Sequence, residues 1–234
     1  MRIEPRVVGS IVHVIKRGAR GMPIVRDKFD RVRFSRSLYF LNDAFSDENW
    51  TVNLRSRALF ERPDHWPDQN PLAHILAWTL MPNHFHLLLE EIKEGGIAKF
   101  MQRLCGSMSA AFNAKYSESG SIFQGSYKSR TVDDDAYVRY LAYYIQVKNV
   151  LELYPGGLMK AIQDFDRAWD WALQYPFSSL GSYAIATNSP IINAPILIEL
   201  FPDRKSFKVE AREMLAINSQ RHNAAYVDLA LDPW

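Results

Sequence analysis

The chain has 234 residues, of which 47% are hydrophobic, 13% aromatic and 23% charged, and its formal net charge is +2. This composition excludes a disordered chain and provides enough apolar residues for a packed core. So small a net charge does not by itself indicate a nucleic-acid partner. Cys105 is the single cysteine, which excludes an internal disulfide and favours a reducing cytoplasm. No secretory signal pattern and no apolar run of about 18 residues is present, so we expect no membrane segment.

Basic residues gather near the start of the chain, where few acids interrupt them. Such a local excess is typical either of a phosphate-binding surface or of an ordinary solvated face. The sequence leaves both interpretations open. The residues are Arg2, Arg6, Lys16, Arg17, Arg20, Arg26, Lys28, Arg31, Arg33 and Arg36.

The first half of the chain predicts a strand, a helix and an irregular region. Alternating apolar residues predict a strand at 9–16, which carries His13. A helix is expected at 27–45, with Asp27 as its N-cap. Strand-like pieces at 50–54 and 58–60 precede a proline-rich loop.

A hairpin follows, with strands at 75–80 and 84–91 joined by the tight turn Met81-Pro82-Asn83. The pattern then predicts an amphipathic helix, an extended strand and a further helix that begins at three acidic residues. Helical pieces complete the chain. These later elements are expected at 97–116, 121–132, 133–153, 158–174 and 206–218.

This order of elements predicts an α+β fold, a ferredoxin-like (split βαβ) antiparallel sheet with helices on it and a C-terminal helical extension. We place the main domain at 1–185 and the extension, of unknown role, at 186–234. In this topology the first and third strands are central neighbours, so His13 is expected beside the strand of His84 and His86.

The sharpest local feature is the His-x-His pair formed by His84 and His86. Side chains alternate along a strand, so both imidazoles lie on one face, about 7 Å apart, and can bind one cation. The alternative is a half-buried strand with two polar positions facing solvent. Two histidines are too few for a closed structural zinc site, which favours an open site completed by water and a substrate phosphate.

A second feature is a stripe of tyrosines on the helix that starts at 133. Tyr137, Tyr140, Tyr144 and Lys148 are three or four residues apart and therefore share one face. The stripe is typical of the polar edge of a buried face. A tyrosine oxygen is also a competent nucleophile where a metal or a base assists its ionisation.

The segment Met-Pro-Asn-His-Phe-His-Leu-Leu at 81–88 resembles the HUH motif of single-tyrosine transposases, in the IS200-like or REP-associated tyrosine transposase branch. Tyr144-Ile145 resembles the segment that carries the nucleophile of that family. The matches follow the order of the family from about residue 8 to 183. Further similar segments lie at 13–18, 27–34, 122–129 and 175–179.

The resemblance implies a metal-dependent endonuclease that nicks and rejoins single-stranded DNA. It also implies that this DNA contains a hairpin and that the protein acts as a homodimer. His84 and His86 would hold Mg²⁺ or Mn²⁺. Tyr144 would attack the scissile phosphate, giving a 5′-phosphotyrosine and a free 3′-hydroxyl. Tyr140 and Tyr143 are the alternative nucleophiles.

One departure concerns the position after the tyrosine, where the family has Asn-Pro and this chain has Lys148-Asn149. A polar residue there helps to ligate the metal in related enzymes, but a lysine ammonium has no lone pair. Lys148 would hold a phosphate instead, or mark decayed activity. Asn149 or Gln146 would reach the metal only on a rotated helix. His13 is either a third ligand or a hydrogen-bonded histidine behind the ligands.

Five residues are expected to contact DNA: Gln124, Lys128, Arg130, Lys148 and Arg17. Two other functions remain open. A decayed HUH-fold protein would bind DNA or RNA hairpins without cleaving them. A hydrolase would use metal-bound water at His84 and His86, with Tyr144 as a structural residue.

Overall fold

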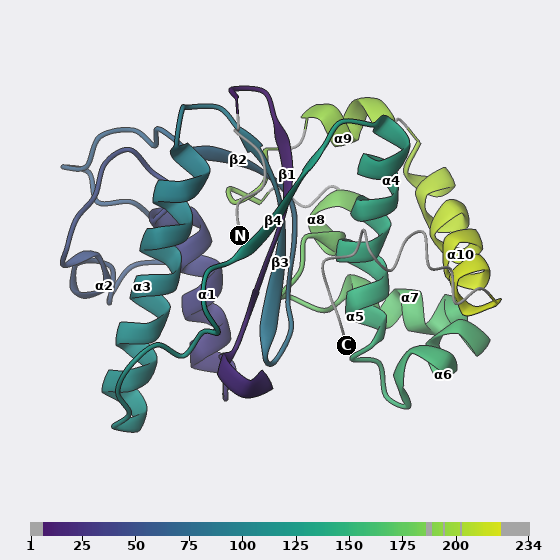
Figure 1. Ribbon diagram of the computed structural model, residues 1–234, viewed down its shortest axis with the longest axis horizontal. Helices are drawn as coiled ribbons and strands as arrows, with labels where there is room; N and C mark the ends of the chain where they lie inside the picture. The colour runs from purple at the N-terminus through teal and green to yellow at the C-terminus, as the bar shows by residue number, and fades with distance from the viewer. Residues whose placement is uncertain (1–6, 186–188, 194, 202, 221–234) are drawn as a thin grey trace.

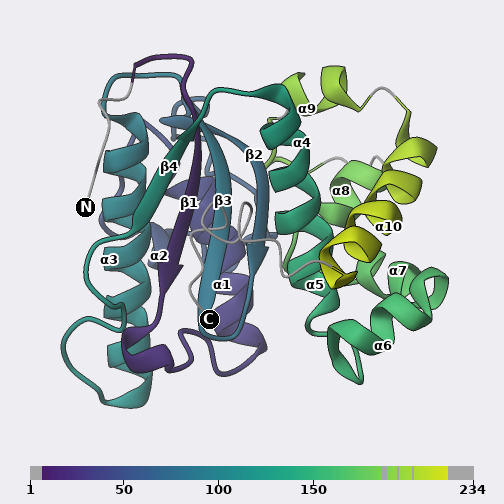
Figure 2. The ribbon, with the colours of Figure 1, turned by 45° about the vertical axis from the view of Figure 1, so that its right-hand side comes forward.

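A four-stranded antiparallel sheet divides the molecule into two helical layers (Figures 1 and 2). The computed structural model describes residues 7–185, 189–193, 195–201 and 203–220. Helices α1 to α3 lie on one side of the sheet, and α4 with the later helices lies on the other (Figure 1). The strands are β1 (Ile11–Arg17), β2 (Ala73–Leu80), β3 (His84–Glu91) and β4 (Lys128–Val132).

The strand order is β2-β3-β1-β4, and each neighbouring pair is antiparallel. Together with a helix after β1 and another after β3, this order is the predicted split βαβ topology. The expected pairing of the first and third strands is confirmed, with His13 opposite Leu88 and Arg17 opposite His84. The last strand is shorter than predicted, because only an isolated bridge from Gly18 to Phe123 precedes it.

The first helical layer contains α1 (Lys28–Phe40), the short α2 (Trp50–Asn53) and α3 (Gly96–Tyr116). Asp27 caps α1 as predicted, because its side chain accepts from Asp30 N while the Asp30 side chain accepts from Asp27 N. Helix α1 ends at Phe40, before the predicted residue 45. The short strands expected at 50–54 and 58–60 are wrong, since that region forms α2 and turns.

The second layer contains the continuation of the chain after β4. The helix predicted at 133–153 begins as α4 (Asp135–Tyr143), passes through the π turn η2 (Tyr144–Lys148) and ends with α5 (Asn149–Leu151). The helix predicted at 158–174 is divided by Asp164. The remaining helices are α6 (Gly157–Gln163), α7 (Phe165–Leu173), α8 (Leu180–Ala184), α9 (Pro195–Leu200) and α10 (Arg204–Gln220).

The two faces of the sheet pack into two separate hydrophobic cores. Val12, Val14 and Phe85 point toward α1 and α3, whereas Leu88 and Leu76 belong to the cluster around α4. This division follows from the alternation of side chains along each strand. It leaves His13 and His86 on the α4 side of the sheet, among other buried polar side chains.

The C-terminal helices pack on the outer side of α4. The ring of Tyr143 lies 4.8 Å from that of Phe207 and 5.2 Å from that of Phe201, centroid to centroid. Its hydroxyl donates to Glu210 of α10, which also pairs with Arg139 of α4. Residues 221–234 of the predicted extension lie outside the described residues. None of the described helices is long and apolar enough to cross a membrane.

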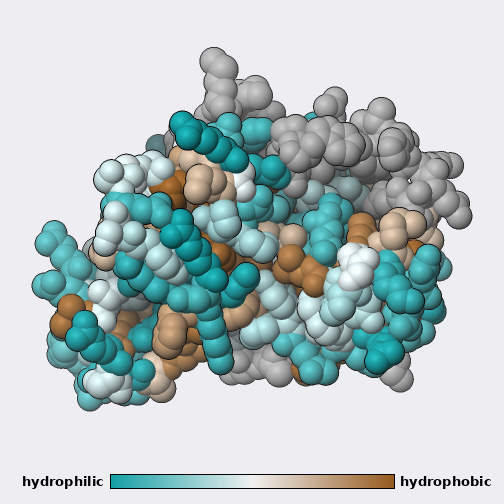
Figure 3. Space-filling model, turned by 90° about the horizontal axis from the view of Figure 1, so that it is seen from below, coloured by the Kyte–Doolittle hydropathy of each residue, from teal (hydrophilic) through white to brown (hydrophobic). Residues whose placement is uncertain are grey.

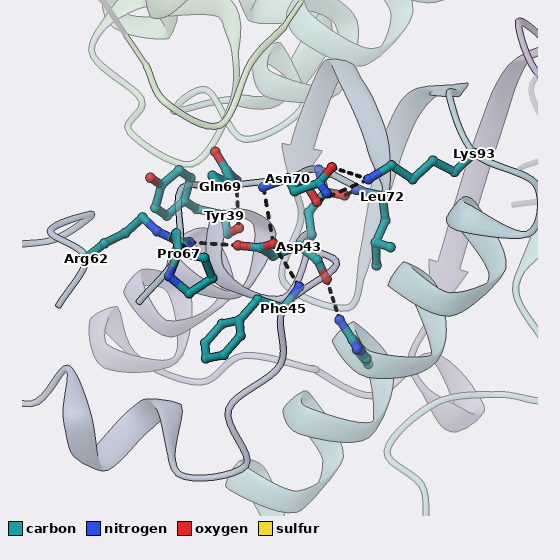
Figure 4. A network of polar contacts seen from close by, with 11 residues as sticks. Tyr39, Asp43, Phe45, Arg62, Pro67, Gln69, Asn70, Leu72 and Lys93 are labelled. Carbon is teal, nitrogen blue, oxygen red and sulfur yellow. Dashed lines mark hydrogen bonds and ion pairs between the residues drawn. The ribbon is translucent and has the colours of Figure 1, made fainter. Parts of the chain in front are cut away.

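The connection between α1 and β2 is held by the buried carboxylate of Asp43 (Figure 4). Asp43 pairs with Arg62 at 2.8 Å and accepts from the backbone N–H groups of Phe45 and Asn70. The backbone carbonyl of Asp43 accepts from Arg103 of α3. One carboxylate thus fixes a long connection that has little regular structure of its own.

Replacing Asp43 should destabilise the fold substantially. Asp43→Ala removes the partner of a largely buried guanidinium and two backbone acceptor contacts, so the free energy of unfolding should fall by about 3 kcal/mol. Urea unfolding followed by tryptophan fluorescence measures the change. The exposed Asp68→Ala, in the same connection, is the control and should differ from the parent by less than about 0.5 kcal/mol.

Candidate active site

Three histidines and one tyrosine gather between the sheet and η2. The ring centroids of His84 and His86 are 5.0 Å apart, and those of His13 and His86 are 5.3 Å apart. The Tyr144 ring lies 5.5 Å from His86 and 6.3 Å from His13. All four side chains are buried. Residues from β1, β3 and the π turn therefore form one compact cluster.

Asn83, in the turn before β3, orients His84. Its Oδ1 lies 2.7 Å from His84 Nδ1, and its Nδ2 donates to the carbonyl of Gly21. An amide oxygen can only accept, so the proton of the neutral imidazole resides on Nδ1. The lone pair is consequently on Nε2, the form in which histidine binds a metal. Sequence reasoning missed this role, because Asn83 was assigned only to the turn.

His13 lies behind His86. Its Nε2 is 3.0 Å from His86 Nδ1, while His86 Nε2 is buried without a hydrogen-bond partner among the described residues. When His86 Nδ1 donates to His13, His86 Nε2 carries the lone pair. Of the two roles considered for His13, this contact fits a histidine that is hydrogen-bonded behind His86.

Burial keeps His13 and His86 in the neutral form. Burial lowers the pKa of His13 to about 3. Burial also lowers the pKa of His86 well below its usual value, with a further contribution from the nearby His13, His84, Lys148 and Arg17. A neutral imidazole is the state required of a metal ligand.

Basic side chains surround the histidines. Arg17 is directly opposite His84 in the β1–β3 ladder, and Arg130 is opposite His13 in the β1–β4 ladder, so each pair shares a face of the sheet. Lys128 is exposed on the same edge strand. Gln124 is also exposed, and its N–H donates to the carbonyl of Arg17. The predicted DNA-contacting residues thus lie near one another.

Most of the N-terminal basic residues serve internal contacts instead. Arg26 pairs with Glu118, Arg33 bonds Ser107, and Arg36 bonds the carbonyl of Leu54. Lys16 is buried and donates to the carbonyl of Gly125. Arg2 and Arg6 lie outside the described residues. Seen from the end of the sheet that carries the β2–β3 turn, the surface is mostly hydrophilic, with hydrophobic patches near its middle (Figure 3).

Because of the π turn, the residue that lies one helical turn after Tyr144 is Asn149 and not Lys148. The N–H of Asn149 donates to the Tyr144 carbonyl, so the hydrogen-bonded ring spans five residues instead of four. Lys148 pairs with Glu152 at 2.6 Å, and its Nζ lies 4.8 Å from the centre of the Tyr144 ring. The Asn149 side chain is buried, and its Nδ2 has no hydrogen-bond partner among the described residues.

Polar groups of β2 and of the segment after α7 support the π turn. Thr79 Oγ1 donates to the carbonyl of Ile145, and Ser179 Oγ is 3.0 Å from Gln146 Oε1. Ser179 also bonds the backbone of Trp78 in β2. Gln146 therefore faces Ser179 and has its oxygen engaged there. These supporting roles of Thr79 and Ser179 carry no spacing signal in the sequence.

The described residues contain no group of three or more His, Cys, Asp or Glu side chains that converge on one point. A cation at His84 and His86 would therefore need ligands of another kind. Amide oxygens, water and phosphate oxygens are the types that Mg²⁺ accepts. The orphaned, buried Nε2 of His86 fits such a cation.

The buried histidines predict acid sensitivity of the metal-free protein. Folded-state pKa values below the unfolded value mean that the unfolded chain binds more protons, so stability is present above about pH 6.5 and is lost as pH falls toward 3. Between pH 7 and pH 5, His13 alone should lower the free energy of unfolding by about 1–2 kcal/mol. Urea unfolding in EDTA measures this. In His13→Phe the free energy of unfolding should depend less steeply on pH, whereas the exposed His65→Gln should leave this dependence unchanged.

Residues 69–148 match the family model described as "Transposase IS200 like". No curated protein matches the chain in sequence. Among solved structures, one similar chain is described as "Structure of the REP associates tyrosine transposase bound to a REP hairpin". It is 14% identical, with a TM-score of 0.45, and the match covers 83% of this chain and 90% of that one. The matched segment contains His84, His86 and Tyr144.

Proposed function

We propose that this protein is a transposase-like endonuclease that nicks and rejoins single-stranded DNA through Tyr144. The observation that carries the proposal is the Tyr144 ring 5.5 Å from His86, on a face that also holds Arg17 and Arg130. A nucleophile, two neutral imidazoles and cations for phosphate are the parts that such a reaction needs.

The proposed cofactor is Mg²⁺ or Mn²⁺, held by Nε2 of His84 and Nε2 of His86. When bound, the ion would polarise the scissile phosphate and stabilise the charge that develops on it. Asn83 and His13 would keep the two imidazoles in the ligand tautomer. Arg17 and Lys148 would balance the phosphate charge.

The proposed reaction exchanges one phosphate ester for another. Tyr144 Oη attacks the phosphorus and loses its proton, and the bond to the 3′ oxygen breaks. The products are a 5′-phosphotyrosine and a 3′-hydroxyl, which takes up a proton. A 3′-hydroxyl from another strand then attacks the phosphotyrosine and releases Tyr144. Because the number of ester bonds is unchanged, rejoining needs no external energy source. We expect the substrate to contain a hairpin and the protein to act as a homodimer in the cytoplasm.

Covalent capture tests the proposal. Labelled single-stranded DNA carrying the hairpins that flank the gene is incubated with the protein and Mn²⁺, then resolved on a denaturing gel. We expect a protein–DNA band that is absent for Tyr144→Phe and reduced at least a hundredfold for His84→Ala.

Tyr143→Phe is the matched control, because Tyr143 faces α10 and should not react. If the unmodified protein binds hairpin DNA but forms no covalent band, it is a DNA-binding descendant without nuclease activity. The position of Lys148 favours that second function.

We further propose that Asn149, not Lys148, is the residue of this helix that reaches the cation. Support comes from the π turn, which gives Asn149 the hydrogen bond to Tyr144 that an α-helix gives to the fourth residue. Lys148 lacks a lone pair and is paired with Glu152. Gln146 is engaged by Ser179.

Metal titration separates the two residues. Mn²⁺ affinity is measured from the electron paramagnetic resonance signal of the free ion. Asn149→Ala should weaken Mn²⁺ binding about tenfold, and Asn149→Asp should restore it. Lys148→Ala should instead tighten binding, because a positive charge is removed. Unchanged Mn²⁺ affinity in Asn149→Ala would exclude Asn149 as a ligand.

A further inference from the structure

A continuous aromatic stack runs along α4 and ends at the candidate nucleophile. The ring centroids of Tyr137 and Tyr140 are 6.1 Å apart with planes inclined by 17°, and those of Tyr140 and Tyr144 are 6.0 Å apart with planes inclined by 29°. Spacings of three and four residues place the rings in one row on the helix. The row thus leads away from the histidines in one direction.

A cation lies at each end of this row. The guanidinium carbon of Arg130 is 6.0 Å from the centre of the Tyr137 ring, and Lys148 Nζ is 4.8 Å from the centre of the Tyr144 ring. Arg130 belongs to β4, which is the last strand of the sheet on that side. The row therefore borders an open edge of the sheet.

The outer rings are not part of the deep core. Val138, Leu141 and Ala142 are the residues of α4 buried in the apolar cluster, whereas Tyr137 and Tyr140 are only half-buried. Tyr143 shows the contrast, because it is buried against Phe201 and against Phe207 of α10. Tyr137 and Tyr140 pack against the margin of this cluster, and each keeps part of its surface exposed to solvent.

We propose that Tyr137, Tyr140 and Tyr144, with Arg130 and Lys148, form a binding track for a single nucleic-acid strand that passes through the candidate active site. Aromatic rings provide stacking surfaces that accept any base, and the cations at the two ends bind phosphates. The exposed Lys128 adds a further positive charge on the same edge. The polarity of the track matches a polyanion with apolar bases, and a duplex would not offer its base faces.

That the bound strand is DNA rests on the proposed function. The binding of a single strand by the track does not depend on cleavage. At the other end of α4, Asp133, Asp134 and Asp135 would repel phosphate. The track is consequently bounded by these acids, and only the nucleotides nearest the scissile phosphate contact the rings.

Binding without cleavage tests the track. All variants are made in the Tyr144→Phe background, which keeps the third ring, and fluorescence anisotropy is measured in EDTA with a labelled 12-nucleotide single-stranded DNA. Tyr140→Leu should weaken binding about fivefold or more, the effect of losing one stacked base, and Tyr140→Phe should restore it. Arg130→Gln should weaken binding and reduce its salt dependence.

Tyr116→Leu is the remote control, because Tyr116 lies at the end of α3 in the other helical layer. Equal binding by Tyr140→Leu and its parent would overturn the track. An equal loss for blunt duplex DNA would also overturn it, because stacked duplex bases cannot reach the rings. A parallel titration with single-stranded RNA shows whether the track discriminates the sugar.

Failure of the proposed function gives a different pattern. If no covalent band forms but the Tyr140 dependence of single-strand binding persists, the track stands and the nuclease proposal fails. If the covalent band forms while Tyr140→Leu binds DNA as its parent does, the nuclease stands and the track fails. Thermal unfolding of each variant confirms that lost binding does not reflect lost folding.

Discussion

The antiparallel pairing of β1 with β3 is the constraint on which the candidate site depends. Seven residues of each strand are in register, and side chains on paired positions share a face. A slip of one residue would turn His13 into the opposite core and separate Arg17 from His84. The register is fixed by the apolar residues between them, since Val12, Val14 and Phe85 must meet α1 and α3. Packing on one face thereby sets the chemistry on the other.

The helix that carries Tyr144 is held from both sides. Toward the sheet, Thr79 and Ser179 bond the π turn, and toward solvent α10 contacts α4 through Glu210 and an aromatic cluster. Buried polar contacts of this kind are costly to break, so they confine the backbone around the tyrosine. For the proposed reaction, this arrangement would set the position of the nucleophile before DNA binds.

The sequence predicted what depends on local pattern. Alternation identified the hairpin, and the order of elements identified the split βαβ sheet. The pair His84 and His86 needed only the period of a strand. The pattern failed where distant groups decide. Residues 50–54 alternate like a strand, yet the connection that holds them follows the buried Asp43, which bonds residues far away in the chain. Nothing local to 144–148 indicates a π turn, because Thr79 and Ser179 lie on other elements.

The π turn can also be understood as an α-helix with one extra residue. An extra residue widens a single turn and leaves the helix on either side with its ordinary geometry. When Lys148 is counted as the extra residue, Asn149 is hydrogen-bonded to Tyr144 as residues four apart are in an uninterrupted helix. The lysine is then an addition beside the ring of Tyr144, and Asn149 takes the place that the fourth residue has in an uninterrupted helix. What the sequence presents as a change of residue type one turn after the tyrosine is, in three dimensions, one added residue.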